Sequence, residues 1–225
     1  MAPLISFRGL VLDVIDPVTA APFWAGTLGL EIGAVDARGA VLHGATPQHT
    51  LRLLGGAAPK TVKNRTHLDV RAPSLEPFAG LHRVTEPGAL PWTVLQSPEG
   101  DEFCVFVSPD VTSPQLKDLE VDAVDHHRIA TWWAGVFGAE AYADDDGTQV
   151  YTYVHGVPGA PFEDIDVAPV PEPRSAPNRL RWDVSPVGGA GADDLVARGA
   201  TVLGRTPDGT LLADPEGNGF RLLDG

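Results

Sequence analysis

The chain has 225 residues, of which 43% are hydrophobic, so it can bury a core in one large domain or two small ones. Its formal net charge is −14, and a surface of this sign repels nucleic-acid phosphates and anionic lipids. The sequence shows neither an apolar run that would span a membrane nor a secretion signal, so we expect a cytoplasmic protein. The single cysteine, Cys104, excludes an internal disulfide and a metal site built from several cysteines.

The first half of the chain is predicted to alternate short strands with helices. A strand-like run, LVLDVID, ends at Asp16, whose side chain is suited to cap a helix with Pro17 in its first turn. Apolar residues at three-to-four spacing continue this helix until Gly29, a typical helix-ending residue. Strands are then expected near residues 31–35, 39–44, 49–54, 65–72, 92–96 and 102–107. A shorter helix is expected from about Ser74, between the fourth and fifth of these strands.

The second half of the chain repeats the first. Three pairs of segments align in order, namely 9–31 with 118–140, 64–70 with 178–184, and the turn 97–100 with the turn 214–217. Collinear matches of this kind indicate a duplication. We therefore divide the chain into a domain over 1–109, a linker over 110–115 and a second domain over 116–225.

The two aligned turns, SPEG and DPEG, are interpreted as structural. Proline fits the second position of each turn and glycine fits the last, and each turn joins two strand-like runs. The acidic run at 144–147 lacks the spacing of a calcium loop and is likewise predicted to be a hairpin turn. We assign no chemistry to these turns by themselves.

Three stretches carry a resemblance to a known family: FWAGTLGLE at 23–31, KNRTHLDV at 63–70 and SPEGDEFCVF at 97–106. They resemble the glyoxalase-like branch of the vicinal oxygen chelate superfamily, which also holds glyoxalase I, bleomycin-resistance proteins and extradiol dioxygenases. The resemblance covers nearly the whole chain, once per half. It implies an α+β fold of two tandem glyoxalase-like domains. Each domain would contain two βαβββ modules whose sheets curl into an incomplete barrel, or cup, around a cavity.

The resemblance also implies where metal ligands would lie. Metal-dependent members carry His, Glu or Gln on the first strand of a module, and Glu on the last strand, four residues after the turn glycine. The corresponding positions here are Val11, His67, Glu120 and Arg181 on first strands, and Cys104 and Arg221 on last strands. His67 would then face Cys104 in a cup of the first domain, and Glu120 would face the two arginines in a cup of the second. A catalytic metal needs about three protein ligands, so no metal cofactor is expected; a weakly held Zn, Ni, Mn or Fe ion on His67 is the alternative.

The residues of the first cup have several interpretations. His67 is a cavity-lining histidine with a hydrogen-bonded neighbour, a general base, or a metal ligand. Glu102 would assist in catalysis, although its place beside the turn favours the solvent-exposed mouth of the cup. Cys104 is interpreted as a small buried lining residue.

The arginines of the second cup keep their protons and so cannot bind a metal. Their paired N–H donors suit a carboxylate or phosphate. An ion pair between Glu120 and one of Arg181 and Arg221 is one alternative, and an anionic ligand is the other.

Further side chains on predicted strands complete the candidate sites. The aromatic residues expected to line the cups and bind flat ligands are Trp92, Tyr151 and Tyr153. Asp69 and Asp183 recur at the same place in both halves, on the strand faces of His67 and Arg181. Their recurrence favours a role in the fold, such as fixing the neighbouring Asn-Arg turn.

These observations support two functions of different class. The first is a small-molecule binding or sequestering protein without a catalytic metal, in the manner of bleomycin-resistance proteins. The second is an enzyme of lyase, isomerase or dioxygenase type that acts through His67, a reading that rests on similarity of fold alone. The expected partner is a small molecule, with no nucleic acid and no membrane, and the chain is expected to be a monomer or homodimer.

Overall fold

The computed structural model describes residues 2–145 and 150–224. The first half contains β1 (Ile5–Asp13), α1 (Pro17–Leu28), β2 (Glu31–Asp36), β3 (Gly39–His43), β4 (Thr50–Leu54), β5 (Thr66–Ala72), the 3₁₀ helix η1 (Glu76–Phe78), β6 (Thr93–Gln96) and β7 (Glu102–Val107). The second half contains β8 (Gln115–Ala123), α2 (His126–Phe137), β9 (Glu140–Asp145), β10 (Val150–His155), β11 (Asp164–Pro169), β12 (Leu180–Pro186), α3 (Ala192–Ala197), β13 (Thr201–Thr206), β14 (Gly209–Ala213) and β15 (Gly219–Leu223). The predicted α+β class and its twofold repeat are confirmed.

The helix ends lie where the sequence predicts them. The Asp16 side chain accepts a hydrogen bond from the Val18 amide at 3.0 Å, and Gly29 ends α1 in the left-handed conformation with φ of 67°. Asp125 and Gly138 have the same roles at the ends of α2. The helix expected from about Ser74 is only the single turn η1. Strands β9 and β10 pair antiparallel, and residues 146–149, on which the predicted hairpin turn partly falls, lie outside the described residues.

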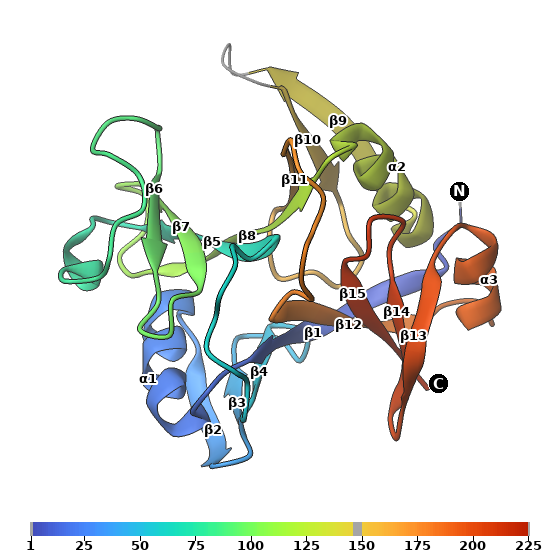
Figure 1. Cartoon of the computed structure of the whole chain (residues 1–225), viewed down its shortest axis with the longest axis horizontal. Helices are drawn as coiled ribbons and strands as arrows, with labels where there is room; N and C mark the ends of the chain where they lie inside the picture. Colours follow the sequence, from blue (N-terminus) through green and yellow to red (C-terminus); the bar gives the residue numbers. More distant parts are fainter. Residues whose placement is uncertain (1, 146–149, 225) are drawn as a thin grey trace.

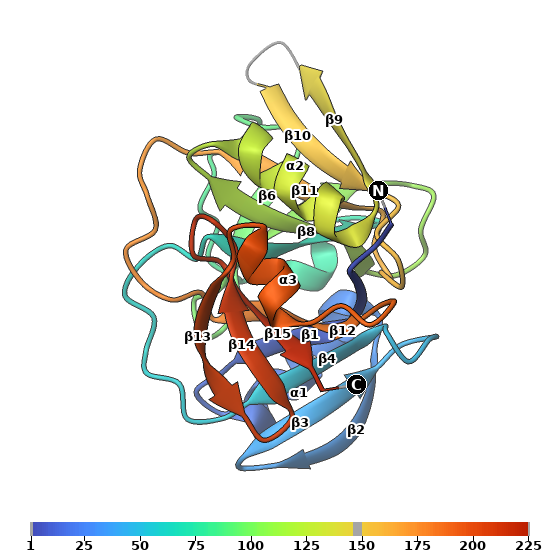
Figure 2. The ribbon, with the colours of Figure 1, turned by 90° about the vertical axis from the view of Figure 1, so that its right-hand side faces the viewer.

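Among the described residues the strands form two sheets, and neither closes into a barrel (Figure 1). One sheet has the order β13-β14-β15-β12-β1-β4-β3-β2, and the other has the order β6-β7-β5-β8-β11-β10-β9. The two sheets lie one above the other (Figure 2). We call the sheet that contains β8 the upper sheet and the sheet that contains β1 the lower sheet, and α2 lies beside the strands of the upper sheet. No helix among the described residues is both long enough and apolar enough to cross a membrane.

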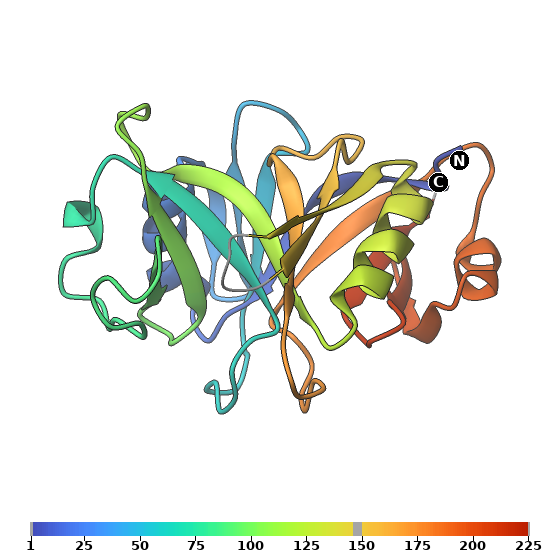
Figure 3. The same cartoon turned by 90° about the horizontal axis from the view of Figure 1, so that it is seen from above.

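Each sheet takes strands from both halves of the chain, which differs from the expectation that each cup forms within one domain. The first strand of every module has one edge that its own module leaves unpaired. These edges pair across the domains, with β1 antiparallel to β12 and β5 antiparallel to β8. Figure 3 shows the continuous upper sheet, in which the teal and green strands of the first half lie beside the yellow-green strand of the second. Each cup is therefore shared between the two domains.

Alternation along the strands separates the core from the cups. Leu68 and Val70 of β5 and Phe103 of β7 belong to the hydrophobic core. Because successive strand residues point to opposite faces, His67 and Cys104 lie on the other face of the same sheet. The amphipathic strands thus place their polar residues toward the cavities.

The glutamates of the two PEG turns connect the modules within each domain. The Glu99 carboxylate accepts hydrogen bonds from the Ile15 amide at 2.7 Å and the Asp16 amide at 3.0 Å, ahead of α1. The Glu216 carboxylate accepts the equivalent bonds from the Val124 and Asp125 amides, at 2.8 and 2.7 Å, ahead of α2. The two turns thus have the structural role that was predicted for them. Each turn glutamate binds the backbone just before a helix and holds the start of that helix next to the turn.

Candidate metal and substrate site

A cavity of about 680 Å³ opens on the face of the upper sheet that is turned away from the core. The residues of its lining that matter here are His67, Trp92, Glu102, Cys104, Glu120 and Tyr151. They come from both halves of the chain, because β5, β7 and β8 are neighbours in this sheet.

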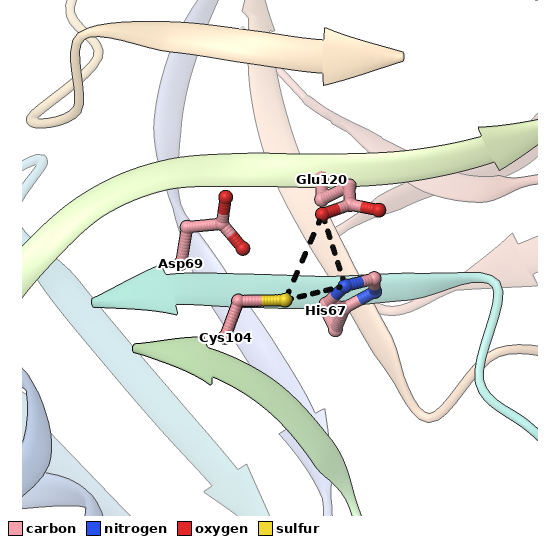
Figure 4. Close-up of side chains that lie close together, drawn as sticks. All are labelled: His67, Asp69, Cys104 and Glu120. Carbon is pink, nitrogen blue, oxygen red and sulfur yellow. Dashed lines mark hydrogen bonds and ion pairs between the residues drawn. The ribbon is translucent and has the colours of Figure 1, made fainter. Parts of the chain in front are cut away.

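Four side chains that can bind a metal meet at or just beneath the floor of this cavity: three of them line it, and the fourth, Asp69, is buried behind them (Figure 4). They are His67 and Asp69 on β5, Cys104 on β7 and Glu120 on β8, and we call them the donor group. One ligand atom from each lies within 4.8 Å of those of the others. His67 Nε2 lies 3.1 Å from Glu120 Oε2 and 3.4 Å from Cys104 Sγ. Cys104 Sγ lies 3.9 Å from the same glutamate oxygen.

The register of the strands produces this arrangement. His67 lies directly opposite Glu120 in the antiparallel pair β5–β8. Asp69 lies beside Cys104 in the parallel pair β5–β7. His67 and Asp69 are two residues apart and so share one face of β5. Thus four residues from three adjacent strands point to one place.

Burial and mutual charge decide the protonation of the donor group. Burial by itself would lower the pKa of His67, but the charge and hydrogen bond of Glu120 raise it to about 9. Burial opposes the ionisation of Glu120 too, yet His67 lowers its pKa below the ordinary value. Burial, followed by the charge of Glu120, raises the pKa of Asp69 well above the ordinary value. Burial, followed by the charge of Asp69, raises the pKa of the Cys104 thiol.

The donor group also contains polar atoms that bond to nothing else in the described part of the chain. Both carboxylate oxygens of Asp69 are buried without a hydrogen-bond partner, and so is Nδ1 of His67. A buried polar group without a partner is costly, and a bound cation would satisfy the carboxylate. Imidazole, thiolate and carboxylate donors are all ligands of divalent transition metals. The residues present therefore fit a metal ion.

Glu102 is buried rather than at the solvent-exposed mouth, so the interpretation of its position is wrong. Its carboxylate lies 2.5 Å from Lys60 Nζ and accepts a hydrogen bond from the Asn64 amide at 3.2 Å. The loop that precedes β5 thus covers it, and only 8% of its side chain is exposed. Both interactions hold the Glu102 carboxylate at the wall of the cavity, outside the donor group.

Two of the three predicted aromatic residues line the cavity. Trp92 stacks on Phe106, and its ring centre lies 6.0 Å from that of Tyr151 on β10. Tyr153 instead stacks on Tyr142 with ring centres 5.1 Å apart, outside the lining. The first two rings form an aromatic wall above the donor group.

The predicted partners of Glu120 lie elsewhere. Arg181 and Arg221 line a separate cavity on the lower sheet, together with Asp183. The expected ion pair between Glu120 and either arginine is therefore wrong, because β8 pairs with β5 and not with β12. Arg181 binds Asp13 at 2.6 Å, and Arg221 binds Asp183 at 2.9 Å.

Asp69 is the residue of the donor group whose role the sequence interpretation missed, although it placed Asp69 on the strand face of His67. Neither Asp69 nor Asp183 fixes the Asn-Arg turn: the first has no hydrogen-bond partner among the described residues, and the second binds Arg52 and Arg221. The turn is held instead by Asn64, which donates to Asp101 at 2.9 Å. The spacing of Asp69 from His67 on one strand was the available signal.

The comparisons agree with this architecture. The family model of the glyoxalase-like domain matches residues 9–106 and again residues 118–223. Glyoxalase I from Zea mays is similar in structure, with a TM-score of 0.70 and 15% identity over 98% of this chain and 92% of that chain. A putative dioxygenase from Bacillus subtilis has a TM-score of 0.63 and 14% identity over 99% of this chain and 86% of that chain. The cppA protein from Streptococcus pneumoniae has a TM-score of 0.53 and 11% identity, over 99% of both chains.

A search of curated proteins found no match. At these identities the solved structures show a shared fold and nothing finer. The two family matches cover most of the sequence, one in each half. The chain thus belongs to the family of glyoxalase-like domain proteins, with two such domains in tandem.

Proposed function

We propose that the chain is a metal-dependent enzyme that acts on a small molecule in the upper-sheet cavity. The observation that carries this proposal is the donor group itself, whose four ligand atoms lie within 4.8 Å of one another. His67, Cys104 and Glu120 would hold the metal, and the buried Asp69 would be a fourth donor. Three protein ligands are enough for a catalytic metal that keeps an open position for substrate. This reverses the expectation of a metal-free site, which had placed Glu120 in another cup.

The chemical types of the four donors limit which metals the site can prefer. Thiolate and imidazole ligands suit Zn, Fe, Co or Ni, whereas Mg and Ca prefer oxygen ligands alone. A divalent metal of this kind supplies Lewis-acid chemistry, polarising an oxygen atom of the substrate.

The chain's own residues would bind and orient the substrate. The rings of Trp92 and Tyr151 offer a flat apolar wall on the same cavity as the donor group. Glu120 is the carboxylate of the donor group that lines the cavity, so it is the group placed to accept a proton from a substrate carbon atom next to a carbonyl. These features favour an isomerase or lyase reaction, with proton transfer at carbon. A dioxygenase reaction is the alternative within the same fold, since one solved structure of similar fold is described as a putative dioxygenase.

A metal-free binding protein is the second candidate function. The contact of 3.1 Å between His67 and Glu120 favours it, because this ion pair neutralises the floor of the cavity without any metal. An organic ligand would then bind between the aromatic wall and the ion pair.

Metal analysis of protein purified without chelator separates the two functions. We expect close to one equivalent of a transition metal per chain, and its loss in His67→Ala and in Glu120→Gln. The matched controls are His82→Ala and Glu172→Gln, which change an exposed histidine and an exposed glutamate outside the donor group and should keep the metal. Protein that holds no metal, and takes up none of Zn, Fe, Co or Ni when incubated with each, would establish the metal-free function instead.

A further inference from the structure

A second cavity, of about 500 Å³, lies on the lower sheet, and its lining residues carry an excess of positive charge. Its charged lining residues are Asp13, Arg52, Arg174, Arg181, Asp183 and Arg221. Four arginines thus face two aspartates, although the whole chain carries a formal net charge of −14. A cavity with an excess of one charge concentrates the field and attracts ligands of the opposite charge.

The two cavities are built on equivalent positions. The register pairs His67–Glu120, Asp69–Cys104 and Glu120–Asp166 of the upper sheet correspond to Arg181–Val11, Asp183–Arg221 and Val11–Arg52 of the lower sheet. Of these positions only the aspartate on the first strand of the second module of each domain, Asp69 on β5 and Asp183 on β12, is the same in both sheets. The histidine and the cysteine are replaced by arginines that cannot bind a cation. The same scaffold therefore presents metal-type donors in one cup and guanidinium groups in the other.

Asp183 orients two of these arginines without neutralising both. Arg221 makes a bidentate contact with it, Nε to Oδ1 at 3.0 Å and Nη2 to Oδ2 at 2.9 Å. Arg52 Nη2 lies 2.5 Å from the same Oδ2. A single carboxylate thus holds two guanidinium groups. The other carboxylate near them, Asp208, lies 3.4 Å from Arg221 Nη1 and is 68% exposed, so it screens the second positive charge only in part.

Arg174 adds a guanidinium group that is also incompletely bonded. Its Nη1 donates to the Ala176 carbonyl at 3.1 Å, but its Nε is buried without a hydrogen-bond partner in the described residues. An unpaired buried N–H donor of this kind is costly unless a ligand satisfies it. Arg174 also lines the cavity, so its guanidinium group is available to an anion bound there.

The rest of the lining is apolar. The residues concerned are Val11, Leu54, Pro177, Leu203 and Leu211. A ligand that fits both parts needs a charged end and an apolar body. Arginine presents N–H donors in a fork that matches carboxylate and phosphate oxygens.

We propose that the lower-sheet cavity binds a small organic anion, in which a carboxylate or phosphate monoester group contacts the arginines and an apolar body contacts the leucines. This site lies in the other sheet from the donor group and does not depend on metal or on catalysis. It also differs from the expected anion site, since Glu120 is absent from it while Arg52 and Arg174 contribute.

Calorimetric titration of the full chain, treated with a chelator so that no metal can bind the probe, tests this proposal. The probes are benzoate, phenyl phosphate and the neutral benzamide. We expect one equivalent of benzoate or phenyl phosphate to bind, and benzamide to bind at least about tenfold more weakly. The tighter of the two anions identifies the head group.

Arg181→Gln and Arg52→Gln are each expected to weaken anion binding about tenfold. Both variants should fold, because Asp183 keeps Arg221 when Arg52 is changed and Asp13 is 36% exposed and can be hydrated. The thermal unfolding midpoint of each variant checks this. Arg38→Gln is the matched control, since that arginine is 93% exposed and lies outside the cavity.

Several outcomes would overturn the proposal. Equal affinity for benzamide would show that the charge is not recognised, and no binding of either anion would show that the site is not a ligand site. Binding that survives both arginine changes, or is abolished by His67→Ala instead, would place the anion in the upper-sheet cavity.

Discussion

His67 Nε2 lies 3.1 Å from Glu120 Oε2, although the two residues belong to different domains. The contact follows from the antiparallel pairing of β5 with β8, which places these residues directly opposite each other. Neither domain contains the whole donor group, because the first supplies His67, Asp69 and Cys104 and the second supplies Glu120. Both halves of the chain are therefore needed to form the donor group.

A thiolate ligand has a spectroscopic signature that tests the role of Cys104. We expect the Co(II)-loaded protein to show a sulfur-to-cobalt charge-transfer band in the near ultraviolet, because Cys104 Sγ lies among the other donor atoms. Cys104→Ser should remove the band and shift the preference of the site from Zn toward metals that favour oxygen. A band that persists in Cys104→Ser would show that sulfur does not bind the metal, since the chain has no other cysteine.

Metal affinity is expected to increase with pH. In the metal-free protein the charge of Glu120, acting against burial, raises the pKa of His67 to about 9, and burial raises the pKa of Cys104. Both ligands must lose their protons to bind a metal, so protons compete with the metal below about pH 9. Zinc titrations in buffers of different ionisation enthalpy should show proton release on binding. An affinity that is constant from neutral pH up to about 9 would contradict the assignment of His67 as a ligand.

Local structure was predictable from the sequence because short-range chemistry determines it. Asp16 caps α1 and Gly29 ends it, as expected from the two residue types alone. The pairing of modules was not predictable, because it depends on which free strand edges meet in three dimensions. Because β5 pairs with β8, Glu120 lies next to His67 and in a different sheet from Arg181. The wrong placement of Glu120 in the cup of the arginines followed from that one pairing.

The role of Asp69 is a second feature that could not be predicted from the sequence. Its recurrence as Asp183 suggested a common role in the fold, but the two carboxylates have different surroundings. In the lower sheet Asp183 meets Arg221, and in the upper sheet the neighbour at that position is Cys104. The function of each aspartate depends on its cross-strand neighbour, which the repeat alignment does not reveal.

The turn glutamates should contribute to stability. Glu99→Ala removes two hydrogen bonds to backbone amides and an ion pair with Arg179, and we expect a loss of about 2–3 kcal/mol in the free energy of unfolding. Glu216→Ala removes only the two bonds to amides and should cost about 1–2 kcal/mol. Urea unfolding measures both, with the exposed Glu172→Ala as the control. Equal and negligible losses in all three variants would show that the amides find other acceptors at no cost.

Glu102 is expected to affect stability more than metal binding. Its carboxylate lies 2.5 Å from Lys60 Nζ, and only 11% of the lysine side chain is exposed. Glu102→Gln leaves that ammonium group without its partner, at a cost of about 1–3 kcal/mol. Adding Lys60→Met should recover part of the loss, while the metal content stays unchanged throughout. Loss of the metal in Glu102→Gln would instead place Glu102 in the catalytic machinery.

The two turn glycines offer a matched test of Arg174. Gly100 and Gly217 occupy equivalent turns with φ of 87° and 93°, so alanine at either costs roughly 1–2 kcal/mol of backbone strain. A Cβ at Gly100 has open space around it, whereas a Cβ at Gly217 would overlap with the guanidinium group of Arg174. That group is the end of a flexible side chain, so it can move without unfolding the protein. Calorimetry should therefore show weaker benzoate binding in Gly217→Ala than in Gly100→Ala, at similar unfolding midpoints. Equal benzoate affinity in the two variants would show that Arg174 does not contact the anion, and would leave recognition to Arg52, Arg181 and Arg221.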